Sequence, residues 1–139
     1  MSYLLDTNVV SEVARSRPNP LVLKWFREVP DESLHLSVLS LGEIRKGIEM
    51  LASGPRREGL RLWLEQELPA WFEQRLLPVS AAVADRWGVL LASARRPVPA
   101  IDSLIAATAV QHGLRLVTRN TEDFRFAGLE LVNPWQATG

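Results

Sequence analysis

The sequence contains no cysteine, and this absence limits the chemistry that the chain can carry. It excludes disulfide bonds, thiolate nucleophiles and cysteine-ligated zinc, so any bound metal ion must be held by oxygen ligands. No apolar run approaches the roughly 20 uninterrupted residues of a membrane span. The N-terminus has no basic region followed by an apolar run, which argues against a signal peptide. We therefore expect a cytoplasmic protein without a membrane span.

Several motifs of nucleotide-dependent enzymes and serine hydrolases are also absent. The chain has no Gly-x-Gly-x-x-Gly, no phosphate-binding loop ending in Gly-Lys-Ser or Gly-Lys-Thr, and no Gly-x-Ser-x-Gly. Neither of its histidines, His35 and His112, belongs to a nucleophile motif, so we interpret both as structural. The 16 basic residues balance 16 acidic ones, so binding to a nucleic acid would need a local basic surface.

The order of apolar and polar segments predicts strands that alternate with helices. With 139 residues, the chain is long enough for one sizeable core, and we expect a single domain spanning residues 1–139. The expected strands cover residues 3–5, 34–36, 76–79, 114–117 and 129–132, and the expected helices contain residues 7–14, 21–30, 41–51, 57–77, 80–94 and 99–112. Pro69 is expected to kink or split the fourth helix. Strands separated by helices require crossover connections, which predicts an α/β fold with a mostly parallel sheet covered on both faces.

Acidic and amide side chains fall where the expected strands end or the following helices begin. Asp6 follows the first strand, and we expect Glu43 and Asp102 in the first turns of two helices. Asn120 and Asp123 follow the strand over residues 114–117. Because loops and helix N-termini meet beyond the carboxyl ends of parallel strands, these segments are predicted to deliver their side chains to one edge of the sheet.

Each acid also has a purely structural explanation. Asp6 can cap a helix, and Ser40 with Glu43 fits a capping box, although Ser37 is an equally good cap for that helix. Asp102 can be stabilised by the positive N-terminal end of a helix dipole, and Asp123 can be a turn residue. Together, however, several adjacent carboxylates would repel one another unless a cation neutralised them.

Oxygen ligands and sparse ligation suit Mg²⁺ or Mn²⁺. Such an ion lowers the pKa of water, aligns it with a phosphorus atom and stabilises the leaving oxygen. The acids therefore predict a nuclease that hydrolyses phosphodiester bonds.

Four motifs in this order resemble the PIN-domain toxins of bacterial toxin–antitoxin pairs, which are called VapC-like. They are Leu-Leu-Asp-Thr-Asn-Val-Val-Ser-Glu at 4–12, Ser-Leu-Gly-Glu-Ile-Arg-Lys-Gly at 40–47, Asp-Ser-Leu-Ile-Ala-Ala-Thr-Ala at 102–109 and Thr-Arg-Asn-Thr-Glu-Asp-Phe at 118–124. The closing Asn-Pro-Trp at 133–135 is similar to the FitB-like branch. The resemblance covers nearly the whole chain and implies a PIN-like α/β fold.

The resemblance also implies roles for individual residues. Asp6 and Asp102 would bind the metal ion directly, with Glu43 as a third acid. Asp123 would be the fourth, because Asn120 stands where some relatives carry aspartate. Asn8 and Thr118 would be supporting polar residues. Relatives are typically homodimers, and a small antitoxin inhibits them while its own N-terminal part binds operator DNA.

Three functions are consistent with these patterns. The first is a toxin acting as an Mg²⁺- or Mn²⁺-dependent endoribonuclease, in which Arg45-Lys46, Arg95-Arg96 and Arg119 are candidates for holding RNA phosphates. The second is a largely non-catalytic component that joins a DNA-binding antitoxin on operator DNA, and the neutral net charge favours it. The third is a phosphatase that uses Asp6 as its nucleophile.

Overall fold

The computed structural model describes residues 1–137 and contains five strands and seven α-helices. The strands are β1 (Tyr3–Leu5), β2 (Leu34–Ser37), β3 (Leu76–Leu77), β4 (Arg115–Val117) and β5 (Leu131–Val132). The α-helices are α1 (Thr7–Val13), α2 (Pro20–Glu28), α3 (Val38–Glu49), α4 (Pro55–Leu62), α5 (Leu68–Phe72), α6 (Ala81–Ser93) and α7 (Ala100–Gln111). Shorter helical turns are η1 (Asp31–Ser33), the π-helical η2 (Trp63–Glu67), η3 (Glu73–Arg75) and η4 (Thr121–Phe124).

The strands form one parallel sheet in the order β3-β2-β1-β4-β5. In the centre of this sheet, Leu5 of β1 lies between Leu36 of β2 and Val117 of β4. Because the strands are parallel and in register here, the residues that follow them leave the sheet at one edge. The backbone N–H of Asp6 donates to the Val117 carbonyl at 2.8 Å, which fixes this arrangement. The predicted parallel α/β fold is confirmed.

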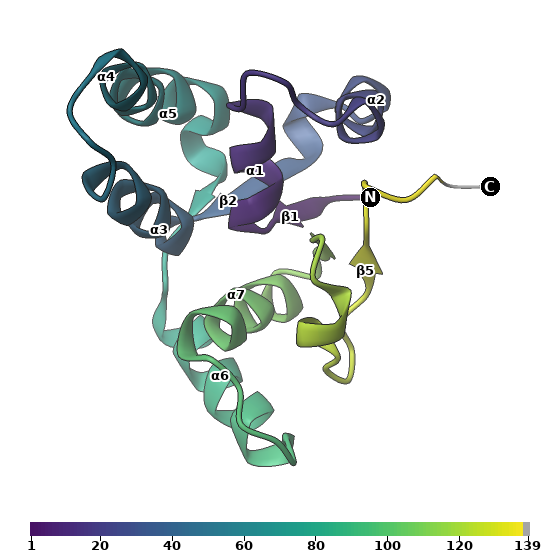
Figure 1. Ribbon diagram of the computed structural model, residues 1–139. Coiled ribbons are helices and arrows are strands. Elements are labelled where there is room, and N and C mark those ends of the chain that lie inside the picture. Colours follow the sequence, from purple (N-terminus) through teal and green to yellow (C-terminus); the bar gives the residue numbers. More distant parts are fainter. Residues whose placement is uncertain (138–139) are drawn as a thin grey trace.

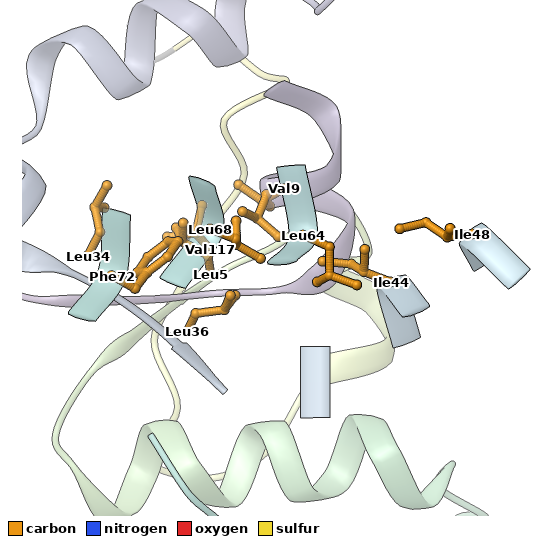
Figure 2. Close-up of a cluster of buried hydrophobic side chains, with 11 residues drawn as sticks. Leu5, Val9, Leu34, Leu36, Ile44, Ile48, Leu64, Leu68, Phe72 and Val117 are labelled. Atoms are coloured by element: carbon orange, nitrogen blue, oxygen red, sulfur yellow. The ribbon is translucent and has the colours of Figure 1, made fainter. Parts of the chain in front are cut away.

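Helices cover both faces of the sheet, as the sequence predicts (Figure 1). Alternate residues of the strands point to opposite faces. Leu5 and Val117 pack into a core on the side of α1, α3 and α5, which Figure 2 shows. Leu4 and Leu116 pack on the other side, where α6 and α7 lie. The carboxyl edge of the sheet therefore lies between two separate apolar layers.

The segment between α3 and β3 was predicted as a long helix that Pro69 kinks or splits, and the structure splits it. Pro69 has no backbone N–H to donate to the preceding turn. The π-helical η2 stands directly before α5, which contains Pro69 in its first turn. This widened turn places Leu64, Leu68 and Phe72 in the core on the α1 side. Trp63 and Trp71 are partly buried against the same core, so they pack into the protein interior.

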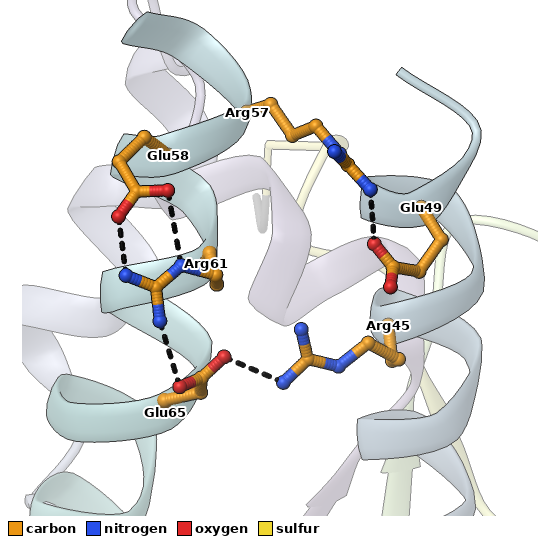
Figure 3. A network of polar contacts seen from close by, with 6 residues as sticks. All are labelled: Arg45, Glu49, Arg57, Glu58, Arg61 and Glu65. Atoms are coloured by element: carbon orange, nitrogen blue, oxygen red, sulfur yellow. Dashed lines mark hydrogen bonds and ion pairs between the residues drawn. The ribbon is translucent and has the colours of Figure 1, made fainter. Parts of the chain in front are cut away.

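A network of ion pairs ties α3 to α4 and η2 (Figure 3). Arg45 of α3 donates to Glu65 at 2.8 Å, and Arg61 donates to the other carboxylate oxygen of Glu65 at 2.9 Å. Arg61 also binds Glu58, and Arg57 binds Glu49 of α3. Arg45 had been a candidate for binding an RNA phosphate, but its guanidinium is already paired with Glu65.

The start of α3 corrects one prediction. Ser37, and not Ser40, caps this helix, because its hydroxyl accepts the N–H of Leu39 at 3.1 Å. The helix therefore begins at Val38, and Glu43 lies in its second turn instead of its first. The Ser40–Glu43 capping box does not form. At the other end of the chain, β5 contains only Leu131–Val132 of the predicted residues 129–132.

Within residues 1–137, the structure has no helix that is both long and apolar enough to cross a membrane.

Candidate active site

Asp6 is the most buried acid at the carboxyl edge of the sheet. It directly follows β1 and caps α1, and its Oδ1 accepts the N–H of Thr7 at 2.8 Å. Its Oδ2 accepts the hydroxyl of Thr118 at 2.8 Å, and only 6% of the residue is exposed. Burial raises the pKa of Asp6 to about 6 despite these two hydrogen bonds, and the charges of Asp102 and Glu43 add to the rise. The side chain is thus fixed in place but disfavoured as an isolated anion.

Asp102 extends this group of acids from the opposite face of the sheet. It lies in the first turn of α7, as predicted, and is partly buried. Burial raises its pKa above the ordinary value, and the negative charges of Glu43 and Asp123 raise it further. Charge repulsion therefore links Asp6, Glu43, Asp102 and Asp123, which lie on four separate segments.

Glu43 reaches the edge from α3 and is oriented by a residue that follows β1. Its Oε1 accepts the hydroxyl of Thr7 at 2.6 Å. The same Thr7 oxygen lies 2.8 Å from the hydroxyl of Ser40, so one threonine joins the first turn of α1 to α3. Thr7 was not among the site residues predicted from the sequence. Its position directly after Asp6 was the signal that it lies at this edge.

Asp123 and Asn120 are the two candidates for the fourth position, and both lie in or beside η4. Both residues are exposed, and the N–H of Asp123 donates to the carbonyl of Asn120 at 3.0 Å. The N–H of Asn120 donates to the Thr118 hydroxyl at 3.0 Å, so this loop supports the residue that holds Asp6. Of the two side chains, Asp123 is the one whose charge acts on Asp102.

The donor atoms of this edge fit a hard divalent cation. Mg²⁺ commonly binds through one or two carboxylates and keeps several of its waters. Among residues 1–137, no three or more His, Cys, Asp or Glu side chains are grouped closely enough to hold a metal ion. The acids thus do not form a closed ligand shell, and a cation bound here would complete its coordination with water. Asn8 Oδ1 is buried next to Thr7 and has no hydrogen-bond partner in the described part of the chain.

Comparison with known proteins places these features in a family. The family model for the PIN domain matches residues 3–129, which include all of the candidate acids. The chain belongs to the PIN domain family. This finding confirms the resemblance on which the sequence analysis relied.

Individual PIN proteins match along nearly the whole chain. The VapC ribonuclease Y4jK of Sinorhizobium fredii is 36% identical, with 96% of this chain and 97% of that protein covered. Toxin FitB of Neisseria gonorrhoeae is 37% identical, with 95% and 97% covered. The solved structure of FitAB bound to an IR36 DNA fragment has a TM-score of 0.89 and 34% identity, and the match covers 99% of this chain and 98% of that one. The PIN fold of this chain therefore extends through the same elements as in its relatives.

Proposed function

We propose that this PIN protein is the toxin of a toxin–antitoxin pair and that it hydrolyses RNA phosphodiester bonds with Mg²⁺ or Mn²⁺. One observation carries the proposal: Asp6 is buried and electrostatically coupled to Asp102 and Glu43, each from a different element of the fold. A buried carboxylate that is repelled by neighbouring acids is costly for stability and is typical of functional sites. Two relatives, a VapC ribonuclease and the toxin FitB, favour this chemistry over others.

In this proposal, Asp6 and Asp102 bind the metal ion. When bound, the ion would activate water and stabilise negative charge on the phosphate. The chain's own contribution is position: Thr7 N–H and Thr118 hydroxyl each hold one oxygen of Asp6, so the carboxylate cannot rotate away.

Glu43 is proposed to take the proton of the attacking water. Its Oε1 accepts the Thr7 hydroxyl, which leaves Oε2 able to accept a proton. Asp123 is proposed to complete the acidic site, and Asn8, Thr118 and Asn120 to support it. The products would carry a 5′-phosphate and a 3′-hydroxyl.

The test is cleavage of a labelled single-stranded RNA by the purified, antitoxin-free protein. Cleavage should require Mg²⁺ or Mn²⁺ and should disappear in Asp6→Asn and in Asp102→Asn while the circular dichroism spectrum stays that of the wild type. The matched control is Asp85→Asn, which removes an exposed aspartate from α6 and should cut RNA like the wild type. Unchanged cleavage in both site variants would refute the proposal.

A partner protein is part of the proposal. One solved relative is FitAB bound to a DNA fragment. By analogy, a small antitoxin would bind this chain and contact operator DNA, and the chain itself would form a homodimer. Co-expression with a candidate antitoxin, followed by size-exclusion chromatography with light scattering, measures both assemblies.

The second candidate function is a largely non-catalytic component of that operator complex. It is favoured by the DNA-bound relative and by Asn120, whose amide provides no negative charge for a metal ion. Purified protein that binds Mn²⁺ but cuts no RNA over long incubation would support it, whereas repeated turnover would exclude it.

A further inference from the structure

Arg119 occupies a position beside the acids that the proposed function leaves unexplained. It directly follows Thr118, whose hydroxyl donates to Asp6, so it leaves the sheet at the same edge. The residue is exposed, and its guanidinium lies over the indole of Trp135, 5.2 Å from the ring centroid. At this distance the ring attracts and orients the cation.

Arg119 has no acidic partner although carboxylates surround the site. Within residues 1–137, its guanidinium makes no salt bridge and no side-chain hydrogen bond. Arg115, at the opposite end of β4, is paired with Glu130 at 2.8 Å. Arg75, which lies over the ring of Phe72, uses its hydrogen-bond donors within the protein. It donates to the carbonyls of Asp31, Leu34 and Trp71. The hydrogen-bond donors of Arg119 thus remain available for a ligand.

The ring beneath Arg119 is itself held in place. The backbone N–H of Trp135 donates to Asn133 Oδ1 at 2.9 Å, and Asn133 Nδ2 lies 3.5 Å from the Arg119 carbonyl. Pro134 between them is buried, and Trp135 packs against the core on the α1 side. The closing Asn-Pro-Trp therefore forms a platform that contacts Arg119 through both its backbone and its side chain.

We propose that Arg119 binds a phosphate of the RNA beside the scissile bond and that Trp135 is its positioning residue. A planar guanidinium can donate two parallel hydrogen bonds to a phosphate, and stacking on a ring fixes its plane before the ligand arrives. The ring also holds the cation over Trp135, where it makes no ion pair with the carboxylates that would bind the metal ion. This inference rests on the proposed function, because it takes the substrate to be RNA.

The test measures RNA binding separately from cleavage. The probe is a fluorescein-labelled single-stranded RNA of about 12 nucleotides, a length within the usual range of single-strand sites. Its fluorescence anisotropy is followed in an Asp102→Asn background, which removes cleavage. Arg119→Ala should weaken binding about tenfold, as expected for the loss of a hydrogen-bonded charge. The slope of log K against log salt should fall by about 0.7, the value for one phosphate on a single strand.

Arg115→Ala is the matched control, because it removes an arginine from the start of β4, at the opposite edge of the sheet from Arg119. It should change neither the affinity nor the salt slope. An Arg119→Ala variant with unchanged affinity and slope would overturn the inference. Failure of the wild-type protein to cut RNA would instead count against the proposed function, so the two failures can be told apart.

Trp135 is tested through its coupling to Arg119. Trp135→Leu keeps an apolar side chain in the core but removes the ring, so it should weaken RNA binding, and Trp135→Phe should restore most of the affinity. In an Arg119→Ala background, Trp135→Leu should have no further effect, because the cation that it positions is gone. Equal effects of Trp135→Leu with and without Arg119 would mean that the tryptophan has only a structural role.

Discussion

Replacing Asp6 with asparagine is expected to stabilise the metal-free protein at pH 8 while leaving its stability near pH 4 almost unchanged. Burial raises the pKa of Asp6 from 3.8 to about 6, which means that the folded protein disfavours the ionised carboxylate. Near pH 4 the folded group is protonated and the unfolded group is about half protonated, so the difference in stability is less than about 1 kcal/mol. As the pH rises through 6, the unfolded chain has already lost the proton, and the wild type loses stability.

The magnitude follows from the difference in pKa. A shift of about two units at roughly 1.4 kcal/mol per unit gives about 3 kcal/mol of destabilisation above pH 7. Asparagine is nearly isosteric and an equally good helix cap, so its Oδ1 can still accept the Thr7 N–H. The Thr118 hydrogen bond favours the ionised carboxylate and already contributes to this pKa, so its loss in the variant needs no separate deduction. The net stabilisation should be about 3 kcal/mol at pH 8.

Urea denaturation in the presence of EDTA measures this difference at pH 4, 6 and 8. Asp85→Asn serves as the control for the loss of one negative charge, since Asp85 is exposed on α6. The advantage of Asp6→Asn over the wild type should grow between pH 4 and pH 7. If the free energy of unfolding of Asp6→Asn at pH 8 is equal to or lower than that of the wild type, the ionised Asp6 carboxylate does not destabilise the folded protein, and the reasoning is refuted.

Three further predictions follow from individual contacts. Thr118→Val removes a hydrogen bond that lowers the pKa of Asp6, so the acid limb of the pH–cleavage profile should move to higher pH; an unmoved limb would contradict this role. Phe72→Ala empties a fully buried position in the core and should lower the free energy of unfolding by about 3 to 5 kcal/mol in urea denaturation. Glu65→Gln removes the carboxylate that joins Arg45 to Arg61 on the surface. Its effect on thermal stability should be small and should vanish in about 1 M salt, where exposed ion pairs are screened; an effect that persists there would mean that the network acts through packing.

The sequence predicts the fold well where local signals are strong. The strands predicted at 3–5 and 34–36 correspond to β1 and β2, and the helix predicted at 80–94 corresponds to α6, which Ser80 caps. The cap of α3 was ambiguous, because Ser37 and Ser40 are chemically identical and one turn apart. What separates them is the contact of Ser40 with Thr7, which lies 33 residues away and which no local pattern reveals.

The candidate site shows the same division between local and distant information. The rule that parallel strands end at one edge predicts Asp6, Glu43 and Asp102 at that edge. In the structure the charges of Asp102 and Glu43 raise the pKa of Asp6, but among residues 1–137 no three such side chains are grouped closely enough to hold a metal ion. The rule could not show that Oε1 of Glu43 accepts a hydrogen bond from Thr7. Nor could it show that Arg45 pairs with Glu65, or that the guanidinium of Arg119 lies over the ring of Trp135. Those pairings depend on how the layers pack against one another.

Calorimetric titration of Mn²⁺ into the wild-type protein and into the Asp6→Asn and Asp102→Asn variants tests the shared acidic site most directly. We expect one saturable site per chain whose affinity falls at least about tenfold in each variant. Wild-type affinity in both variants would contradict it, because Asp6 and Asp102 would then not hold the same ion.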